Sequence, residues 1–379
     1  MTSSPLAGLT VVSIEQAVAA PFATRQLADL GARVIKIERA SGDFARGYDT
    51  TVKGEASYFV WLNRGKESVV LDLKDEHDQG VLRSMLRKAD IFVSNLAPGA
   101  IDRMGLDREA LREINPRLIS ISISGFGTSG PYARKKAYDL IIQCETGLLS
   151  LTGTEQDPAK VGVSIADIAA GMYAYSGALA ALIQRGRTGQ GDHIEISMLE
   201  ALGEWMQQTY LYAEYSGKAP KRSGPAHASI APYGPFQASD GVLFLGLQNE
   251  REWALFCDRV LQQQDLAEDP AYSSNSLRVT NRGKLGQLIE ERLAARTVAE
   301  VQALLDEIGI ANAQMRTMAE YSAHPQLAAR ERWAEIETPG GPVRVAVPPV
   351  TFGEPIMGAV PALGEHTERV LAEFGRSRA

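Results

Sequence analysis

Residues 9–38 read LTVVSIEQAVAAPFATRQLADLGARVIKIE, and this stretch decides the fold. Two runs rich in β-branched residues, 9–14 and 33–38, flank a segment with Pro21 near its start and Gly31 at its end. Proline is well tolerated in the first turn of a helix, and glycine favours a helix end. The stretch therefore predicts a strand–helix–strand unit of the kind that builds parallel sheets.

The same alternation continues for another 85 residues or so. Apolar runs at 68–73, 91–95 and 118–123 predict further strands, and the segments 79–88 and 107–114 predict helices between them. Strands that are apolar throughout, rather than at every second position, are typical of a parallel sheet covered on both faces. We therefore expect an α/β fold with a Rossmann-like, doubly wound parallel sheet.

The second half of the chain is organised differently. Helical segments are expected at 138–151, 167–185 and 198–215. The stretch 216–231 is rich in Gly, Pro, Ser and Lys and indicates a boundary. We expect a large Rossmann-like domain over 1–225, a small α+β domain over 226–330, and a C-terminal return to the large domain over 331–379.

The composition narrows the class of protein. With 379 residues, 45% hydrophobic and 22% charged, the chain is long enough for about two globular domains. Its net charge of −7 argues against general nucleic-acid binding. The longest apolar run, 165–183, contains Asp167, so we expect no membrane span and a cytoplasmic protein. Two cysteines and five histidines without metal-ligand spacing predict no metal site.

A nicotinamide dehydrogenase is the first function to test. In dinucleotide-binding folds an acidic residue at the end of the second strand binds the ribose, and Glu38 lies at that place. Such folds also need a glycine-rich first turn, where the backbone touches the pyrophosphate. Here the turn at 15–21, EQAVAAP, has no glycine. The formal match GFGTSG at 125–130 runs directly into Pro131 and Tyr132 instead of a helix. The dehydrogenase interpretation is rejected.

One carboxylate stands out in an apolar setting. Asp167 lies in VGVSIADIAAGM, residues 161–172, near an expected helix start. Residue types alone favour its interpretation as an N-cap that accepts backbone N–H groups. Alternatively it is a nucleophile, since a carboxylate is already ionised at pH 7 and needs no base. The small neighbours would leave room for a bulky acyl donor, and the helix N-terminus would favour the ionised form.

Motifs spread over nearly the whole chain resemble the family III coenzyme A transferases, which include formyl-CoA transferase, carnitine CoA-transferase and α-methylacyl-CoA racemase. The motifs are LAGLTVV at 6–12, DLGARVIKIE at 29–38, NRGK at 63–66, LDLK at 71–74, DRMG at 102–105, SGFG at 124–127, GPY at 130–132, GQG at 189–191 and LGEHT at 363–367. The resemblance implies a Rossmann-like large domain, a small domain inserted late in the chain, and an obligate homodimer of two interlocked rings.

The resemblance also implies a mechanism. Asp167 falls on the family's nucleophile, which carries the acyl group as an anhydride and then CoA as an aspartyl thioester. CoA and acyl-CoA are then substrates, and no cofactor is permanently bound. Gln16 matches a position beside the thioester and is the expected oxyanion donor. The expected CoA contacts are Arg39, Lys74, Asn95, Leu96, Arg103, Lys136 and Met198.

Position 138 separates two branches of the family. The racemase branch has a histidine there as one of two proton-transfer groups, whereas this chain has Tyr138, as formyl-CoA transferase does. A tyrosine, with a pKa near 10, is a poor base at neutral pH but can donate a hydrogen bond to an oxyanion. A racemase or isomerase is the alternative within the family. A non-catalytic CoA-binding protein of the same fold is the alternative outside it.

The acceptor is expected to be a small dicarboxylate, with succinyl-CoA as the donor. The glycine-rich lid of formyl-CoA transferase is replaced by ASIAPYG at 228–234, so we expect an acceptor other than oxalate. The chain looks similar to the itaconate and mesaconate group, and citramalate is a further candidate. Arg46 could pair with a distal carboxylate, or could form a structural ion pair such as with Asp43. The other expected substrate contacts are Tyr48, Tyr58 and His227.

Overall fold

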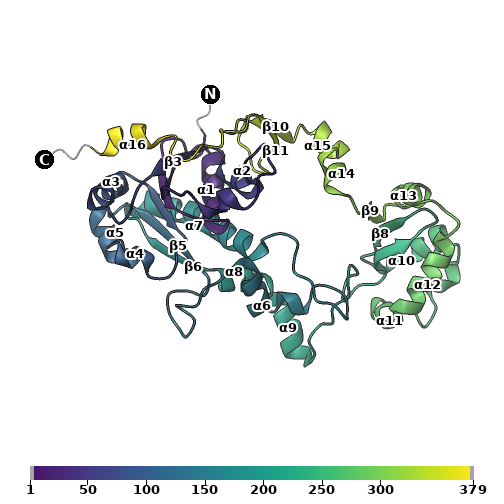
Figure 1. The fold of residues 1–379 in the computed structure, drawn as a ribbon. Coiled ribbons are helices and arrows are strands. Elements are labelled where there is room, and N and C mark those ends of the chain that lie inside the picture. The colour runs from purple at the N-terminus through teal and green to yellow at the C-terminus, as the bar shows by residue number, and fades with distance from the viewer. Residues whose placement is uncertain (1–3, 376–379) are drawn as a thin grey trace. The chain divides into compact units, whose positions relative to one another are not determined.

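The computed structural model describes residues 4–375 and divides into two compact units (Figure 1). The large unit comprises the chain up to residue 148, residues 161–210 and the chain from 326 onward. The small unit comprises residues 149–160 and 211–325. The division expected from the sequence places the first boundary later, at 225, and assigns no earlier segment to the small domain.

A six-stranded parallel sheet forms the centre of the large unit, in the order β3-β2-β1-β4-β5-β6. The strands are β1 (Thr10–Ile14), β2 (Arg33–Glu38), β3 (Lys66–Val70), β4 (Ile91–Ser94), β5 (Ile119–Ser124) and β6 (His193–Ser197). The predicted parallel α/β sheet is confirmed, but β6 was not predicted from the sequence. The strand order reverses between β1 and β4, and open parallel sheets bind ligands at such a switch point.

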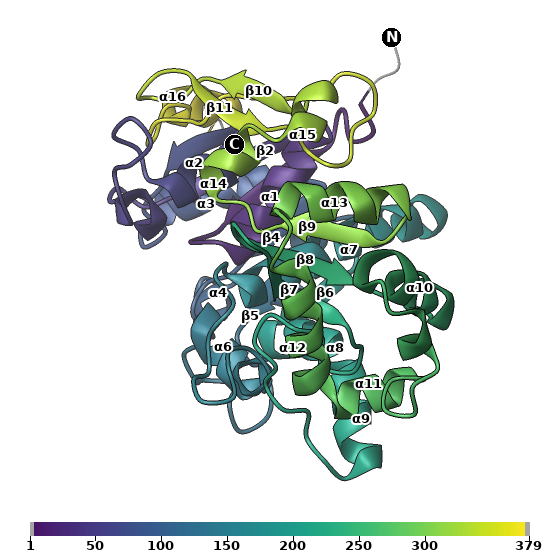
Figure 2. The same cartoon turned by 90° about the vertical axis from the view of Figure 1, so that its right-hand side faces the viewer.

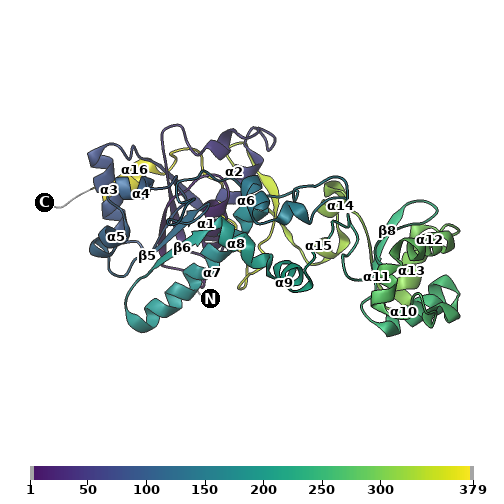
Figure 3. The same ribbon diagram turned by 90° about the horizontal axis from the view of Figure 1, so that it is seen from below.

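Helices cover both faces of this sheet because successive strand residues point to opposite sides. Val11 packs with α1 (Ala19–Asp29), α7 (Ile165–Thr188) and α8 (Met198–Trp205) on one face. The next residue, Val12, belongs to the core on the other face. That second core includes α3 (Glu76–Leu86), α5 (Arg108–Ile114) and α16 (Thr367–Phe374). Figure 3 shows the sheet from below, with α7 running beside β5 and β6.

Shorter elements complete the large unit. They are a 3₁₀ turn at Phe44–Gly47, α2 (Ser57–Asn63), α4 (Ala100–Arg103), α6 (Asp139–Glu145) and the antiparallel pair β10 (Trp333–Ile336) and β11 (Val343–Ala346). A 3₁₀ turn at Leu148–Ser150, α9 (Gln207–Ser216) and α15 (Pro325–Ala329) each contain a point where the chain passes between the units.

The small unit has its own sheet and core. Its antiparallel strands are β7 (Tyr233–Gln237), β8 (Val242–Gly246) and β9 (Ala311–Gln314), in that order. Its helices are α10 (Glu250–Phe256), α11 (Asn275–Thr280), α12 (Arg282–Leu293), α13 (Val298–Glu307) and α14 (Met318–Ser322), with helical turns at Cys257–Leu261 and Gln264–Ala267. The helix α12 packs against β7, and α13 packs against β8 and β9, around buried residues such as Trp253 (Figure 2).

The helix α7 positions the most unusual carboxylate of the chain. It has 24 residues, and by length and composition alone it could cross a membrane. Its alanines, however, pack against α1 in the core of the large unit, so α7 is a core helix of that unit. Close contact requires Gly171, where an added Cβ would lie 2.6 Å from the carbonyl oxygen of Ala19. The first turn of α7 is thereby held beside the start of α1.

Candidate active site

Two cavities lie at the carboxyl ends of the parallel strands, and both are built by the large unit alone. One, the Asp167 cavity, has a volume of ≈ 520 Å³ and lies beyond β4, β5 and β6. The other, the Arg39 cavity, has a volume of ≈ 480 Å³ and lies beyond β1, β2 and β3. Gln16 and Leu96 line both cavities, so the two adjoin at the switch point of the sheet.

The two cavities bring together most of the residues singled out from the sequence. The Asp167 cavity is lined by Gln16, Tyr48, Tyr58, Asn95, Leu96, Lys136, Tyr138, Asp167 and Met198, together with Asp139 and Ser164. The Arg39 cavity is lined by Gln16, Arg39, Lys74, Leu96 and Arg103, among others.

Asp167 is the third residue of α7 and is half-buried. The N-cap position of the helix is Ser164, whose side chain makes no capping bond. Instead, Oδ1 of Asp139 accepts the backbone N–H groups of Ala166 at 2.7 Å and Asp167 at 3.5 Å. The interpretation of Asp167 as the N-cap is therefore wrong, because a carboxylate from another helix caps α7. This leaves the Asp167 side chain to line the cavity.

Burial and the neighbouring Asp139 carboxylate raise the pKa of Asp167 from 3.8 to about 7. The expectation of a fully ionised carboxylate at pH 7 is therefore corrected: protonated and ionised forms coexist at neutral pH. A carboxylate of higher pKa is also a stronger nucleophile and a poorer leaving group. Asp139 itself is fixed, since its Oδ2 accepts from Nε2 of buried Gln143 at 2.6 Å.

Aromatic side chains form one wall of the Asp167 cavity. The rings of Tyr48 and Tyr58 meet edge to face, with centroids 5.7 Å apart, and Phe44 lies 5.7 Å from Tyr48. The Tyr58 hydroxyl lies 3.2 Å from Oγ of Ser164, just before α7. Burial, with the carboxylates of Asp43 and Asp167, raises the pKa of Tyr48 to about 12. Tyr48 therefore stays protonated and can donate a hydrogen bond.

The turn between β1 and α1 also lines the Asp167 cavity. The backbone N–H of Gln16 donates to Oδ1 of Asn95 at 2.8 Å, and Nδ2 of Asn95 donates to the carbonyl of Gln16 at 2.8 Å. Asn95 thus clamps the Gln16 peptide. The helix α1 starts without a side-chain cap at Val18, and Val18 and Ala19 line the cavity. A helix N-terminus at this place favours negative charge in the cavity.

The lining of the Arg39 cavity is mixed in charge, with the basic side chains of Arg39, Lys74 and Arg103 and the acidic side chains of Glu15, Glu38, Asp43 and Asp72. Arg39, Lys74 and Arg103 line it from the ends of β2, β3 and α4 respectively. The guanidinium of Arg39 donates to the carbonyl of Gly42 at 3.1 Å, which fixes its orientation. Converging arginines and a lysine suit phosphate groups, because guanidinium groups bind phosphate oxygens in pairs and ammonium adds point charge.

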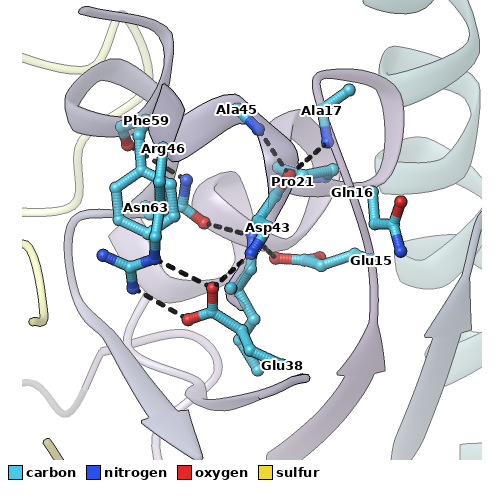
Figure 4. Close-up of polar contacts among 12 residues, drawn as sticks. Glu15, Gln16, Ala17, Pro21, Glu38, Asp43, Ala45, Arg46, Phe59 and Asn63 are labelled. Atoms are coloured by element: carbon cyan, nitrogen blue, oxygen red, sulfur yellow. Dashed lines mark hydrogen bonds and ion pairs between the residues drawn. The ribbon is translucent and has the colours of Figure 1, made fainter. Parts of the chain in front are cut away.

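Arg46 differs from the sequence-based expectation of a substrate contact. Its guanidinium makes a two-pronged pair with Glu38, at 2.9 Å through Nε and 2.8 Å through Nη2. It also stacks on the ring of Phe59 at 3.7 Å (Figure 4). Arg46 is not among the described residues that line either cavity. The structural alternative is favoured, although the partner is Glu38 rather than Asp43.

His227 belongs to the small unit and is not among the described residues that line either cavity. Its ring stacks on Tyr233 with centroids 5.1 Å apart, and its Nδ1 accepts the backbone N–H of Ser229 at 3.2 Å. These contacts hold the histidine within its own loop. Its role toward a substrate stays a prediction.

Sequence reasoning did not single out Asp139 or the buried Lys36 as functional residues. Lys36 gave a signal that could have been used. It lies between two isoleucines in a strand expected to be covered on both faces, so its ammonium has to be paired inside the protein. Asp139 gave no local signal, because its contacts with α7 cross 27 and 28 residues of sequence.

Comparison with known proteins adds to this geometry. The family model described as CoA-transferase family III matches residues 6–367. The chain is 38% identical over 348 residues to the acetyl-CoA:oxalate CoA-transferase of Acetobacter aceti, covering 90% of this chain and 89% of that one. It is 34% identical over 379 residues to the succinyl-CoA:glutarate CoA-transferase of Mus musculus, covering 98% and 87%. The crystal structure of a CAIB/BAIF family protein from Brucella suis is similar, with a TM-score of 0.86 at 36% identity, covering 98% and 100%.

Proposed function

Because this chain belongs to the family III CoA-transferases, we propose that it moves CoA from an acyl-CoA donor to a small dicarboxylic acid, with Asp167 carrying the transferred group. The observation that carries this proposal is the pair of adjoining cavities. The Arg39 cavity, which carries three basic side chains suited to phosphates, shares two lining residues with a cavity that holds a carboxylate of raised pKa.

We place CoA across both cavities. Arg39, Lys74 and Arg103 would hold its phosphate groups in the Arg39 cavity. The thioester end would then pass Gln16 and Leu96 into the Asp167 cavity. This placement uses the switch point of the sheet, which is the usual ligand position in open parallel folds.

The proposed reaction starts with the ionised carboxylate of Asp167. It attacks the thioester carbonyl, the C–S bond breaks, and CoA leaves as a thiolate from a mixed anhydride. The thiolate then attacks the aspartyl carbonyl, which releases the donor acid and leaves an aspartyl-CoA thioester. The acceptor carboxylate attacks that thioester, and the thiolate returns to the acceptor carbonyl. Each step exchanges one activated acyl group for another, so no ATP is consumed.

The raised pKa of Asp167 supports this sequence. A carboxylate of ordinary pKa is a much better leaving group than a thiolate. The mixed anhydride would therefore lose its carboxylate to the returning thiolate, and the first step would run back toward acyl-CoA. Raising the carboxylate's pKa toward that of a thiol, about 8.5, narrows this difference. The Asp167 nucleophile is then more reactive, and its anhydride is less unstable relative to the thioester.

Donors for the tetrahedral oxyanion are available on two walls of the Asp167 cavity. The Gln16 amide, the uncapped start of α1 and the protonated hydroxyl of Tyr48 are our candidates. Tyr138 is a further candidate, although it is 69% exposed in the described chain. The aromatic wall would also limit the access of water to the anhydride.

A dicarboxylate acceptor is supported by the relatives, which are named for oxalate and glutarate. The sequence led us to expect an acceptor other than oxalate. Because one relative is named for oxalate, oxalate is again among the acids to be tested, beside itaconate, mesaconate and citramalate. With Arg46 paired to Glu38, Lys136 is our candidate for the distal carboxylate, since it lines the Asp167 cavity. The other lysine there, Lys135, is paired with Glu145 at 2.6 Å.

The two alternatives are less well supported. A racemase needs two proton-transfer groups on opposite sides of the α-carbon, and Tyr138 is a poor base. A protein that only binds CoA would not need a carboxylate of raised pKa in the cavity that adjoins the Arg39 cavity. We further propose, on the family resemblance, that the enzyme is an interlocked homodimer in the cytoplasm.

A competition assay tests the proposed function. Purified protein receives succinyl-CoA or acetyl-CoA with a mixture of oxalate, succinate, glutarate, itaconate, mesaconate, citramalate and butyrate, and the CoA esters are identified by mass. We expect a dicarboxyl-CoA ester as the main product, and none with Asp167→Asn. Equal use of butyrate would remove the dicarboxylate assignment. The absence of any new ester would remove the transferase assignment for these donors.

A further inference from the structure

Five buried charged side chains and the partly buried Arg46 lie together near the turn between β1 and α1. The acids Glu15, Glu38 and Asp43 and the bases Lys36, Arg46 and Lys66 make up this ion cluster. Figure 4 labels the three acids and Arg46. The side chains of Lys36, Asp43, Glu15 and Lys66 are each 0% exposed. Three negative and three positive charges cancel, so the cluster is neutral as a whole.

The contacts within the cluster are short. Nζ of Lys36 donates to Oδ2 of Asp43 at 2.7 Å, and Nζ of Lys66 donates to Oε1 of Glu15 at 2.6 Å. Oδ1 of Asn63 accepts from both ammonium groups, at 3.0 and 3.2 Å. Each buried charge is therefore paired and hydrogen-bonded, which is the condition for keeping it inside a protein.

Stability alone does not account for such a cluster. Well-packed apolar side chains in place of a buried ion pair often leave a protein equally or more stable. The cluster also adjoins the candidate site, since Glu15, Glu38 and Asp43 all line the Arg39 cavity. Its location points to a role in that site.

Asp43 connects the cluster to the β1–α1 turn. Its Oδ1 accepts the backbone N–H of Ala17 at 3.1 Å, while its Oδ2 is held by Lys36. Ala17 has a φ of 60°, in the left-handed region that is unfavourable for a residue with a Cβ. A charged acceptor fixed at this point compensates for that conformation, because hydrogen bonds to ionised groups are the strong ones. Such backbone strain is concentrated at functional sites.

We propose that Asp43 is a positioning residue for the proposed transfer reaction. Hydrogen-bonded to Lys36, it keeps Ala17 in the left-handed conformation. It thereby sets the direction of the neighbouring Gln16 amide and of the start of α1 at the Asp167 cavity. This inference rests on the proposed function, and it assigns a purpose to the buried charges that the reaction itself does not use.

A second clamp makes the assignment more specific. Asn95, which follows β4, holds the backbone of Gln16, since its Oδ1 accepts the Gln16 N–H and its Nδ2 donates to the Gln16 carbonyl. Asp43, which follows β2, holds the next peptide N–H. Two consecutive peptide groups are thus fixed from the two strands that flank β1. The backbone of Asp43 is itself anchored, since its N–H donates to Oε2 of Glu38 at 2.9 Å.

The test is the variant Asp43→Asn, which keeps an acceptor oxygen but removes the charge. We expect kcat to fall about 10- to 100-fold, the range for a small misplacement at a reacting centre. The KM for the acyl-CoA should change less than about threefold, because Arg39, Lys74 and Arg103 are untouched. A wild-type kcat in the folded variant would overturn the proposal.

The single variant leaves Lys36 unpaired, so the same measurement is made on Lys36→Met/Asp43→Asn, which removes both charges together. Its kcat should fall in the same way, and a wild-type kcat would again overturn the proposal. The matched control is Asp29→Asn, which weakens a largely buried pair with Arg64, at 2.8 and 2.7 Å, whose members line neither cavity. This control should lower the melting temperature and leave kcat unchanged.

A rescue experiment separates positioning from general stability. Glycine adopts a φ of 60° without the penalty that alanine pays. Ala17→Gly in the Asp43→Asn background should therefore recover part of the lost kcat, without restoring the melting temperature. No recovery would mean that Asp43 does not act through Ala17. Absence of transfer by the wild-type enzyme would sink the proposed function itself, whereas wild-type transfer with fully active Asp43 variants would sink this inference alone.

Discussion

Replacing Asp167 by asparagine should make the protein more stable at alkaline pH while removing its activity. In the native state the pKa of Asp167 is raised from 3.8 to about 7. Between these two values the native chain holds a proton that the unfolded chain has lost. The free energy of unfolding therefore falls as the pH rises from about 4 to about 7, and the full penalty persists above 7.

The size of the penalty follows from the shift. About three pKa units at 1.36 kcal/mol each give a ceiling of about 4 kcal/mol at pH 8. Because Asp167 is half-buried and borders a cavity, water reduces this value, and we expect a gain of about 1–3 kcal/mol from Asp167→Asn at pH 8. At pH 5 most of the penalty has not yet developed. The gain should therefore shrink by about 1–2 kcal/mol there.

Urea unfolding of both proteins at pH 5 and pH 8 measures this difference. The background Asp139→Asn is the matched control, because it keeps an oxygen acceptor for the start of α7 and removes the neighbouring charge. In that background the gain from Asp167→Asn at pH 8 should be smaller. The reasoning fails if Asp167→Asn changes stability equally at both pH values, or destabilises the protein at pH 8.

Three further outcomes are expected. The value of kcat/KM should fall below about pH 7 as Asp167 becomes protonated, and a pH–rate profile of Asp139→Asn should show this limb moved to lower pH. Arg46→Met should lower the free energy of unfolding by about 3–5 kcal/mol, because it leaves Glu38 buried without its partner. Its kcat/KM should fall equally for glutarate and butyrate, and a loss confined to the dicarboxylate would return Arg46 to the substrate site. Incubation of a 2-methylacyl-CoA in D₂O without acceptor should give no deuterium at the α-carbon, since Tyr138 is not a base; rapid wash-in seen by mass would favour a racemase.

The framework of the large unit was predictable because its signals are local. The β-branched runs and helix-ending residues between 9 and 123 predict five strands that the structure contains. The sixth strand, β6, was missed because His193 and Glu195 interrupt its apolar residues. A strand at the edge of a sheet needs fewer apolar residues than a central one, so its pattern is weaker.

The site was predictable only in part. Asp167 was found because a carboxylate among alanines and isoleucines is unusual, and the resemblance then gave it a role. The raised pKa of this carboxylate was not predictable, since Asp139 approaches it from another helix. The general difficulty is to predict which charged side chains pair with one another. Lys66 meets Glu15 across 51 residues of sequence, and Arg46 pairs with Glu38 rather than with the nearer Asp43.

The central claim is that Asp167 carries the transferred group, and peptide mass spectrometry after brief mixing with succinyl-CoA tests it most directly. The experiment uses wild-type protein and Asp167→Asn, quenched in acid and digested. The account predicts a mass increase on the peptide that contains Asp167, equal to a CoA thioester or a succinyl group, in the wild type only. An adduct on a different peptide, or transfer activity retained by Asp167→Asn, would contradict it.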